Sequence, residues 1–310
     1  MGSPQFAVPS LESLFSSTHE VVAVVTQPDR PKGRNLLPHP PPVKVVAHRL
    51  GIPVLQPVTT KSDIFLEEMR SFHPDLLVVV AYGEILRATL LNLPPNGAVN
   101  LHASLLPKYR GAAPIPWAIL QGESHTGATT MLINEVMDGG AILLQEECTI
   151  LPADTSHALT KKIANLGAPL LKRTVDLLQR KEITPKPQDL TQVTYAPKLR
   201  KEDGKIDWNN TASWISRQIR AFDPWPGSFS CFRDLRVKFW LAHTKEGEAK
   251  DPPGTVIAVM KHSFQIACGK GTILEVLEIQ PENRPRFPAA DFIHGYSIHP
   301  QDRFVSSPVP

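Results

Sequence analysis

The chain has 310 residues, of which 42% are hydrophobic and 20% charged, so it can form one large core and a second, smaller one, and we expect two domains. The net charge of +3 is mildly basic, so a nucleic-acid partner has to be inferred from local charge. The chain has no apolar run of the roughly 20 residues that a membrane span needs, no signal-peptide pattern and no CxxC pair among its three cysteines, which predicts a cytoplasmic protein without a disulfide framework or a cysteine-based zinc site.

In the first half of the chain, short apolar runs rich in β-formers alternate with helical patterns. The predicted strands are 21–25, 52–55, 76–80, 98–101, 129–134 and 141–147, and the predicted helices are 42–50, 62–72, 85–91 and 155–180. Continuous apolar strands interleaved with helices are typical of a mostly parallel sheet with helices on both faces. Residues 1–180 are therefore predicted to form a Rossmann-like α/β domain.

The N-terminus lacks a strand that such a domain would normally have. Gly2-Ser3-Pro4 reads as a turn and Pro9 opens a helix, but no strand leads into the turn. Either the start lies upstream of Met1 or the sheet lacks a member. A chain that begins at Met1 should have a markedly less stable sheet, because a buried neighbour would lose its ladder partner.

The composition of the sequence changes after the long predicted helix. Residues 181–207 contain three prolines and many lysines without apolar periodicity, which predicts a basic linker. Beyond it, a helix over 211–222 precedes short strands that are separated by Gly, Pro and Asp; these are predicted at 229–232, 237–242, 254–259, 264–267 and 272–279. Residues 208–310 are therefore predicted to form a small, OB-like β-barrel domain.

Asn100 and His102 form a polar pair at the end of a predicted strand. Because they are two residues apart, their side chains point to the same face. The amide could donate to a developing oxyanion while the imidazole moves a proton, which suits a carbonyl reaction. A hydrogen-bonded polar pair without catalytic function fits the spacing equally well.

Asp138 follows the next predicted strand, in a turn that contains Gly139 and Gly140. Ligand-contacting loops occupy this place in α/β sheets, and a carboxylate there could orient His102 and raise its basicity. A turn former or a helix cap is the alternative interpretation.

The run from Val99 to Ile115, Val-Asn-Leu-His-Ala-Ser-Leu-Leu-Pro-Lys-Tyr-Arg-Gly-Ala-Ala-Pro-Ile, resembles the signature of the folate-dependent formyltransferases. Asp138 lies where that family has its catalytic aspartate. Segments 26–34, 194–198 with 206–208, and 220–227 resemble the members of the family that act on methionine carried by initiator tRNA. Together these segments extend over nearly the whole chain.

The resemblance implies transfer of a formyl group from 10-formyltetrahydrofolate to the α-amine of methionyl initiator tRNA. Separately, the 11 histidines are scattered without ligand spacing beside carboxylates, so no metal site is expected. By position, Asn100 would stabilise the oxyanion, and His102 with Asp138 would relay the proton. The family holds the folate at the positions of Ser104, Leu105, Leu106 and Pro107, with Tyr82 and Gly83 as further candidates for the lining of the pocket. Core or turn positions are the alternative for both.

The predicted tRNA contacts come from two segments. The loop 29–44 matches a family insertion that reaches the acceptor end, with Arg34 as the matching arginine and Lys32 beside it. Asn35-Leu36-Leu37 follow here, where typical members carry further basic residues. Residues 172–205 hold nine basic and five acidic residues, which predicts a track for phosphates that includes Lys198 and Lys201. A solvated charged linker is the alternative.

Three other functions remain open on the sequence. A formyltransferase acting on an amino sugar nucleotide, or a 10-formyltetrahydrofolate hydrolase, would use the same Asn100, His102 and Asp138. An RNA-binding protein would use the barrel and the linker, with the α/β part as a scaffold. The oligomeric state expected for the chain is a monomer.

Overall fold

The computed structural model describes residues 1–32 and 37–306, and the chain falls into two compact units. Unit 1 contains Met1–Pro114, His125–Thr149 and Thr160–Pro197, and unit 2 contains Ile115–Ser124, Ile150–Leu159 and Lys198–Pro310. The segment 181–207, predicted as a linker, divides between them at residue 197. Within the described ranges, no helix combines the length and apolar character that crossing a bilayer requires.

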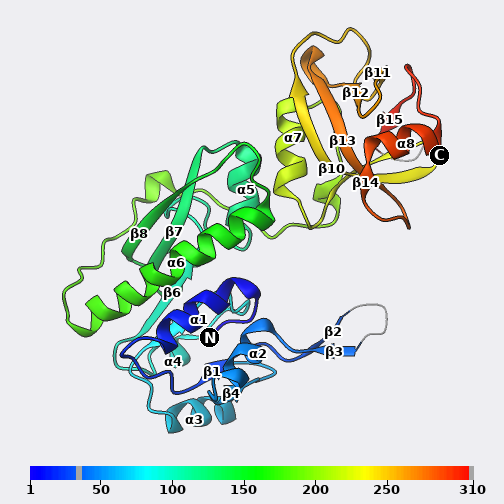
Figure 1. Ribbon diagram of the computed structural model, residues 1–310. Helices are drawn as coiled ribbons and strands as arrows, with labels where there is room; N and C mark the ends of the chain where they lie inside the picture. The colour runs from blue at the N-terminus through cyan, green and yellow to red at the C-terminus, as the bar shows by residue number, and fades with distance from the viewer. Residues whose placement is uncertain (33–36, 307–310) are drawn as a thin grey trace. The chain divides into compact units, whose positions relative to one another are not determined.

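Unit 1 is an α/β unit in which helices pack around short strands (Figure 1). Its helices are η1 (Gln5–Ala7), α1 (Val8–Phe15), α2 (Pro42–Arg49), α3 (Asp63–Ser71), α4 (Ala88–Leu91) and most of α6 (Ser156–Gln179). Its strands are β1 (Val24–Val25), β2 (Arg30–Lys32), β3 (Leu37–His39), β4 (Val54–Leu55), β5 (Leu77–Val79), β6 (Ala98–His102), β7 (His125–Leu132) and β8 (Ile142–Thr149). The predicted helices and strands of this half are all present, whereas the β2–β3 hairpin was not predicted.

The sheet pairing is parallel in the first part of unit 1 and antiparallel in the second. β1 pairs with β4, and β5 with β6, in parallel. β6 pairs with β7, and β7 with β8, antiparallel. The predicted, mostly parallel direction holds for β5, β6 and β8, and β7 is the one strand of these four that runs the other way. β7 and β8 are joined by a short turn over residues 133–141, which can connect only antiparallel neighbours, because a parallel pair needs a long crossover.

Met1 and Gly2 lie between β1 and β5, which are not paired with each other. The Gly2 amide donates to the Val25 carbonyl at 3.0 Å, the Met1 amine donates to Val78 O at 2.6 Å, and the Val80 amide donates to Met1 O at 2.9 Å. These two residues therefore bridge the chain of β1 and that of β5.

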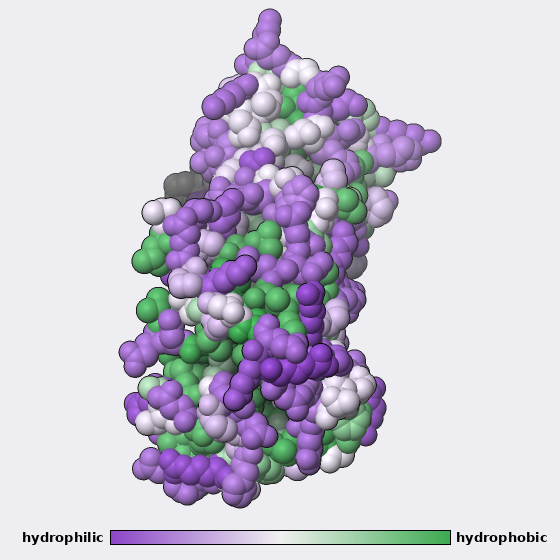
Figure 2. Space-filling model, turned by 90° about the vertical axis from the view of Figure 1, so that its left-hand side faces the viewer, coloured by the Kyte–Doolittle hydropathy of each residue, from purple (hydrophilic) through white to green (hydrophobic). Residues whose placement is uncertain are grey.

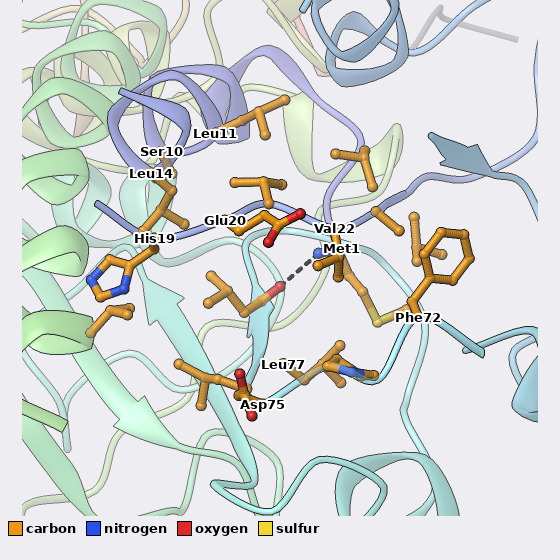
Figure 3. Close-up of a pocket in the computed structure, with 18 of the residues that line it drawn as sticks. Met1, Ser10, Leu11, Leu14, His19, Glu20, Val22, Phe72, Asp75 and Leu77 are labelled. Atoms are coloured by element: carbon orange, nitrogen blue, oxygen red, sulfur yellow. Dashed lines mark hydrogen bonds between the residues drawn. The ribbon is translucent and has the colours of Figure 1, made fainter. Parts of the chain in front are cut away.

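A cavity of about 860 Å³ adjoins these two residues (Figure 3). It is lined by the chain around β1 and β5 and by the inner side of α1. Ser10 faces it with a buried hydroxyl that has no hydrogen-bond partner in the described structure. Burial lowers the pKa of the Met1 amine to about 5. The sheet is thus incompletely packed at this point.

Helix α6 packs closely on the strand that carries the Asn–His pair. A Cβ at Gly167 would lie 2.8 Å from the Leu101 side chain, so the absence of a side chain there lets the helix approach β6. The Thr174 hydroxyl on α6 lies 2.8 Å from the Thr130 hydroxyl on β7. These contacts fix the helix against both strands and hold the end of β6 in place.

Unit 2 contains a curled antiparallel sheet with helices beside it. Its helices are α5 (Pro114–Gln121), α7 (Ala212–Ala221), α8 (Ala289–Tyr296), the 3-10 turns η3 (Glu202–Gly204) and η4 (Gly269–Gly271), and the start of α6; η2 (Leu190–Gln192) belongs to unit 1. Its strands are β9 (Ser228–Phe232), β10 (Leu235–Lys245), β11 (Val256–Val259), β12 (Phe264–Ala267), β13 (Ile273–Pro281), β14 (Phe287–Pro288) and β15 (Phe304–Val305). Helices α5 and α8 were not predicted.

The strand order of this sheet is β11-β12-β13-β10-β9-β15, and its two ends meet. The Val256 amide donates to Asp302 O, and the Phe304 amide donates to Gly254 O, both at 2.8 Å. Phe304 packs against Trp208 and Phe239 inside the curl. The predicted OB-like β-barrel is confirmed.

The described surface carries apolar side chains as well as charged ones. On the face drawn in Figure 2, apolar residues are exposed between hydrophilic ones. Among the exposed large hydrophobic side chains are Val136 and Met137, which directly precede Asp138. The turn that holds Asp138 therefore presents apolar surface at its tip.

Candidate active site

Strand β6 carries Asn100 and His102 on one face, as their spacing predicts. Asn100 stands opposite Val79 on β5 and Met131 on β7, so the strand is paired on both sides at this residue. Asn100 is half-buried and His102 is buried. An interior strand of a sheet is a rigid support, and it fixes both side chains at the point where the chain leaves the sheet.

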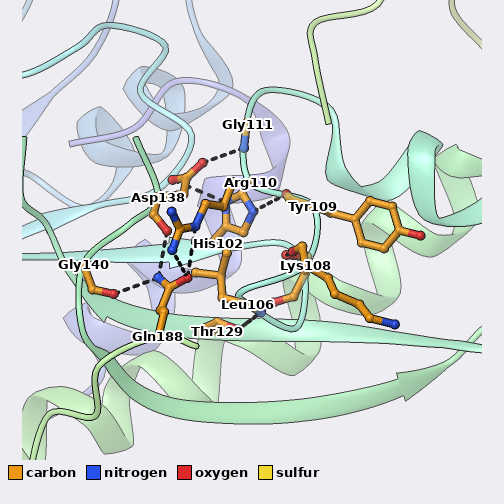
Figure 4. Close-up of polar contacts among 11 residues, drawn as sticks. His102, Leu106, Lys108, Tyr109, Arg110, Gly111, Thr129, Asp138, Gly140 and Gln188 are labelled. Atoms are coloured by element: carbon orange, nitrogen blue, oxygen red, sulfur yellow. Dashed lines mark hydrogen bonds and ion pairs between the residues drawn. The ribbon is translucent and has the colours of Figure 1, made fainter. Parts of the chain in front are cut away.

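The His102 ring lies between two partners, one on each nitrogen (Figure 4). Nε2 is 2.9 Å from the Tyr109 carbonyl oxygen, and Nδ1 is 3.6 Å from Oδ1 of Asp138. Because a carbonyl oxygen can only accept, Nε2 carries the proton of the neutral ring and Nδ1 has the lone pair. His102 can therefore take up a proton on Nδ1, where the carboxylate of Asp138 would stabilise the resulting cation.

Asp138 is held in a tight turn between β7 and β8. Its backbone is left-handed, with φ of 49°, and its Oδ2 accepts a hydrogen bond from the Gly111 amide at 2.8 Å. A Cβ at Gly140 would overlap the carbonyl oxygen of Leu132, so only glycine fits there. The turn thus directs one carboxylate oxygen to the loop after β6 and the other to His102.

Two buried residues to which the sequence analysis assigned no role complete this cluster. Arg110 donates to Oε1 of Gln188 from Nε at 3.1 Å and from Nη2 at 2.7 Å. Gln188 donates through Nε2 to the carbonyl oxygens of Asp138 and Gly140, at 2.8 and 2.7 Å. Gln188 lies within a proline-rich, charged stretch, and its position there gives no sign of burial. Arg110 belongs to the quoted signature, but its spacing does not reveal its partner.

The loop Ser104–Pro107 is tied down by hydrogen bonds to neighbouring strands. Ser104 is fully buried and its hydroxyl donates to Lys108 O at 2.6 Å. The Leu106 amide donates to the Thr129 hydroxyl at 3.1 Å, and Leu106 O accepts from Gln145 Nε2 at 2.8 Å. The loop is a fixed backbone surface beside His102, which is what a cradle for a flat ligand requires.

Tyr82 and Gly83 follow the neighbouring strand β5. Tyr82 is buried in the apolar core of unit 1, and burial, with a smaller effect of Glu84, raises the pKa of its hydroxyl to about 12. The hydroxyl has no hydrogen-bond partner in the described structure. Gly83 has φ of 89° and open space where a Cβ would lie. Of the two, Gly83 offers the accessible backbone.

The structure describes three of the four basic residues that were predicted to contact tRNA. Lys198 and Lys201 are exposed on unit 2. Lys32 ends strand β2, and Arg34 lies outside the described residues. In the described part of the chain, no group of three or more His, Cys, Asp or Glu side chains could hold a metal ion.

Comparison with known proteins identifies the family. The model of the formyl transferase family matches residues 1–175, and that of the formyl transferase C-terminal domain matches residues 198–297. A methionyl-tRNA formyltransferase of Citrifermentans bemidjiense is 45% identical over 300 residues, which is 97% of this chain and 93% of the relative. The chain belongs to the methionyl-tRNA formyltransferase family. It is therefore a formyltransferase.

Two further similarities agree with this membership of the family. The methionyl-tRNA formyltransferase of Thermodesulfovibrio yellowstonii is 45% identical over 298 residues, 96% of this chain and 95% of the relative. Among solved structures, the sugar 3N-formyl transferase WlaRD, in the presence of dTDP and 5-N-formyl-THF, is similar with a TM-score of 0.67 at 19% identity. The match covers 92% of this chain and 97% of the WlaRD chain, and it supports the assignment of the fold.

Proposed function

We propose that this enzyme transfers the formyl group of 10-formyltetrahydrofolate to the α-amino group of methionyl initiator tRNA. The observation that carries the proposal is the arrangement of Asn100 and His102 on β6 with Asp138 beside His102. The methionyl-tRNA formyltransferases to which the chain is similar match nearly its whole length. A formyl donor derived from folate is the one that formyltransferases of this family use.

The first step makes a bond from the amine nitrogen to the formyl carbon, and the carbonyl electron pair moves onto oxygen. We assign Asn100 to that oxygen, because its side-chain amide is a neutral donor on a strand paired on both sides. A donor fixed before reaction stabilises the developing charge without reorganising. The tetrahedral species then collapses, and the bond from carbon to folate nitrogen breaks.

The second assignment concerns protons. The attacking amine must lose a proton, and the departing folate nitrogen must gain one. We assign this relay to His102, because the Tyr109 carbonyl leaves Nδ1 as its basic nitrogen. Asp138, 3.6 Å from Nδ1, would stabilise the imidazolium between the two transfers.

We assign substrate binding to the remaining candidates. The backbone of Ser104, Leu105, Leu106 and Pro107 would hold the folate, with the backbone at Tyr82 and Gly83 along the pterin. Lys32, Arg34, Lys198 and Lys201 would contact tRNA phosphates. We place the enzyme in the cytoplasm, because its proposed acceptor is a tRNA used in translation, and we propose that it acts as a monomer.

The experiment that tests the proposal offers the purified protein three acceptors: methionyl initiator tRNA, an amino sugar nucleotide, and water alone. With 10-formyltetrahydrofolate, methionyl initiator tRNA should be formylated with saturation kinetics, whereas the amino sugar nucleotide should not. Release of formate to water should be slow. Formylation of the sugar alone, or rapid formate release with no formyl-methionyl-tRNA, would replace the proposal with a sugar formyltransferase or a hydrolase.

A further inference from the structure

Gln188 makes every hydrogen bond that its carboxamide can form. Its two N–H groups are used by the carbonyl oxygens of Asp138 and Gly140, and its oxygen accepts twice from Arg110 (Figure 4). A guanidinium group has only donors, so the carboxamide oxygen must face Arg110 and the nitrogen must face the two carbonyls. Arg110 therefore fixes the orientation of Gln188, and Gln188 fixes the backbone of the Asp138 turn.

The same segment of chain also holds the loop that contacts the other nitrogen of His102. The Arg110 amide donates to Thr194 O at 2.9 Å, and the Ala196 amide donates to Arg110 O at 2.7 Å. Lys186 and Ile142 exchange two hydrogen bonds of 2.8 Å beside the Asp138 turn. Residues 186–196 thus tie together the two loops whose Tyr109 O and Asp138 Oδ1 face the His102 ring.

We propose that Gln188 is a positioning residue for formyl transfer, acting through Asp138. It touches no reacting atom; it holds the left-handed backbone of Asp138 so that the carboxylate stays between the Gly111 amide and His102. The inference rests on the role proposed above for Asp138. One buried residue of the segment predicted as a linker, Gln188, would in this way support the catalytic machinery.

The test replaces Gln188 by Glu, which keeps the shape but puts an oxygen against two carbonyl oxygens. Outer-shell partners in metal sites change activity by about 10- to 100-fold, and we expect kcat to fall by a similar factor. KM for both substrates should stay within about twofold, because the interaction acts on the reacting geometry. Gln188→Asn, which adds no charge and is shorter, should also lower kcat and serves if the Glu variant does not fold.

Gln192 provides the matched control, because it is exposed on the same segment. Gln192→Asn, which matches Gln188→Asn and adds no charge beside Asp189, should leave kcat unchanged. The decisive measurement adds Gln188→Glu or Gln188→Asn to an Asp138→Asn background, where a residue acting through Asp138 should cause no further loss. If the losses in kcat multiply in the double variants, or if the single Gln188 variants raise KM and leave kcat unchanged, the positioning role is overturned.

The two proposals can fail separately. If Asp138→Asn is slow and both Gln188 variants match the wild type, only the positioning role is overturned. If Asp138→Asn turns over like the wild type, the proposed relay fails, and the role of Gln188 fails with it.

Discussion

At the scale of single residues, the chemistry depends on which nitrogen of His102 is basic. The Tyr109 carbonyl, 2.9 Å from Nε2, determines this. The 3.6 Å from Nδ1 to Asp138 is longer than a hydrogen bond, so the carboxylate approaches the ring without binding its neutral form. The distance would shorten when Nδ1 takes a proton, so stabilisation is greatest in the charged state that the reaction passes through.

Asn100→Asp tests the oxyanion assignment with little change in shape. The variant removes the donor and adds negative charge, so kcat should fall by about 10²- to 10³-fold, the usual cost of losing an oxyanion donor. KM should change little. The measurement is steady-state kinetics with both substrates. A variant whose kcat is unchanged would show that Asn100 only stabilises the end of the strand.

The sequence allows prediction of some site residues and not others. Asn100 and His102 are adjacent on one face because strand geometry has a period of two, so their proximity could be predicted. Asp138 faces His102 only after a turn that depends on the glycine at 140. Gln188 reaches the turn from a segment 50 residues away, and such long-range contacts leave no local pattern.

At the scale of helices and strands, apolar periodicity predicts most elements of both units. The exceptions have physical reasons. Helix α5 begins at Pro114 and is mostly apolar, with four aliphatic residues and a tryptophan in eight, so no polar face marks it as a helix. The reversal of direction between β7 and β8 depends on the length of their connection and not on their composition.

The gap between β1 and β5 leads to a prediction about stability. Four β-branched residues added before Met1 would extend the Met1–Gly2 segment through the 860 Å³ cavity and bury apolar side chains there. Filling it should raise the melting temperature by at least about 3 °C, because each kcal/mol shifts a domain of this size by about 2–4 °C. A Gly-Ser extension of equal length is the control. Equal melting temperatures for the two would contradict this account of the cavity.

The pH dependence of stability should change with the same extension. The buried Met1 amine has a pKa of about 5 in the folded chain, below its ordinary value of 8.0. Between these values the unfolded chain binds more protons, so the free energy of unfolding should rise as the pH increases from about 5 to 8. An added residue turns the amine into an amide, and that rise should flatten. Denaturant titrations at several pH values measure the free energy of unfolding. An extended chain in which that free energy rises with pH as steeply as in the original chain would contradict the prediction.

At the scale of the whole molecule, a net charge of +3 leaves tRNA binding to local groups of basic residues. Replacing Lys198 and Lys201 by Gln should raise KM for tRNA and lessen its salt dependence, by a slope of about one for each phosphate that a lysine no longer neutralises. KM for the folate should stay the same. Lys250→Gln with Lys261→Gln, also exposed on unit 2, is the control pair. Equal effects of both pairs would show that the contribution is general charge.

The central claim is that His102 and Asp138 carry out formyl transfer to methionyl initiator tRNA. It is tested most directly by the single-turnover rate of formyl-methionyl-tRNA formation by saturating wild-type and Asp138→Asn enzyme. We expect rapid formylation by the wild type and a rate lower by about 10²-fold or more in the variant, because proton transfer through His102 would be impaired. A wild type that forms no formyl-methionyl-tRNA, or a variant that forms it at the wild-type rate, would contradict the account.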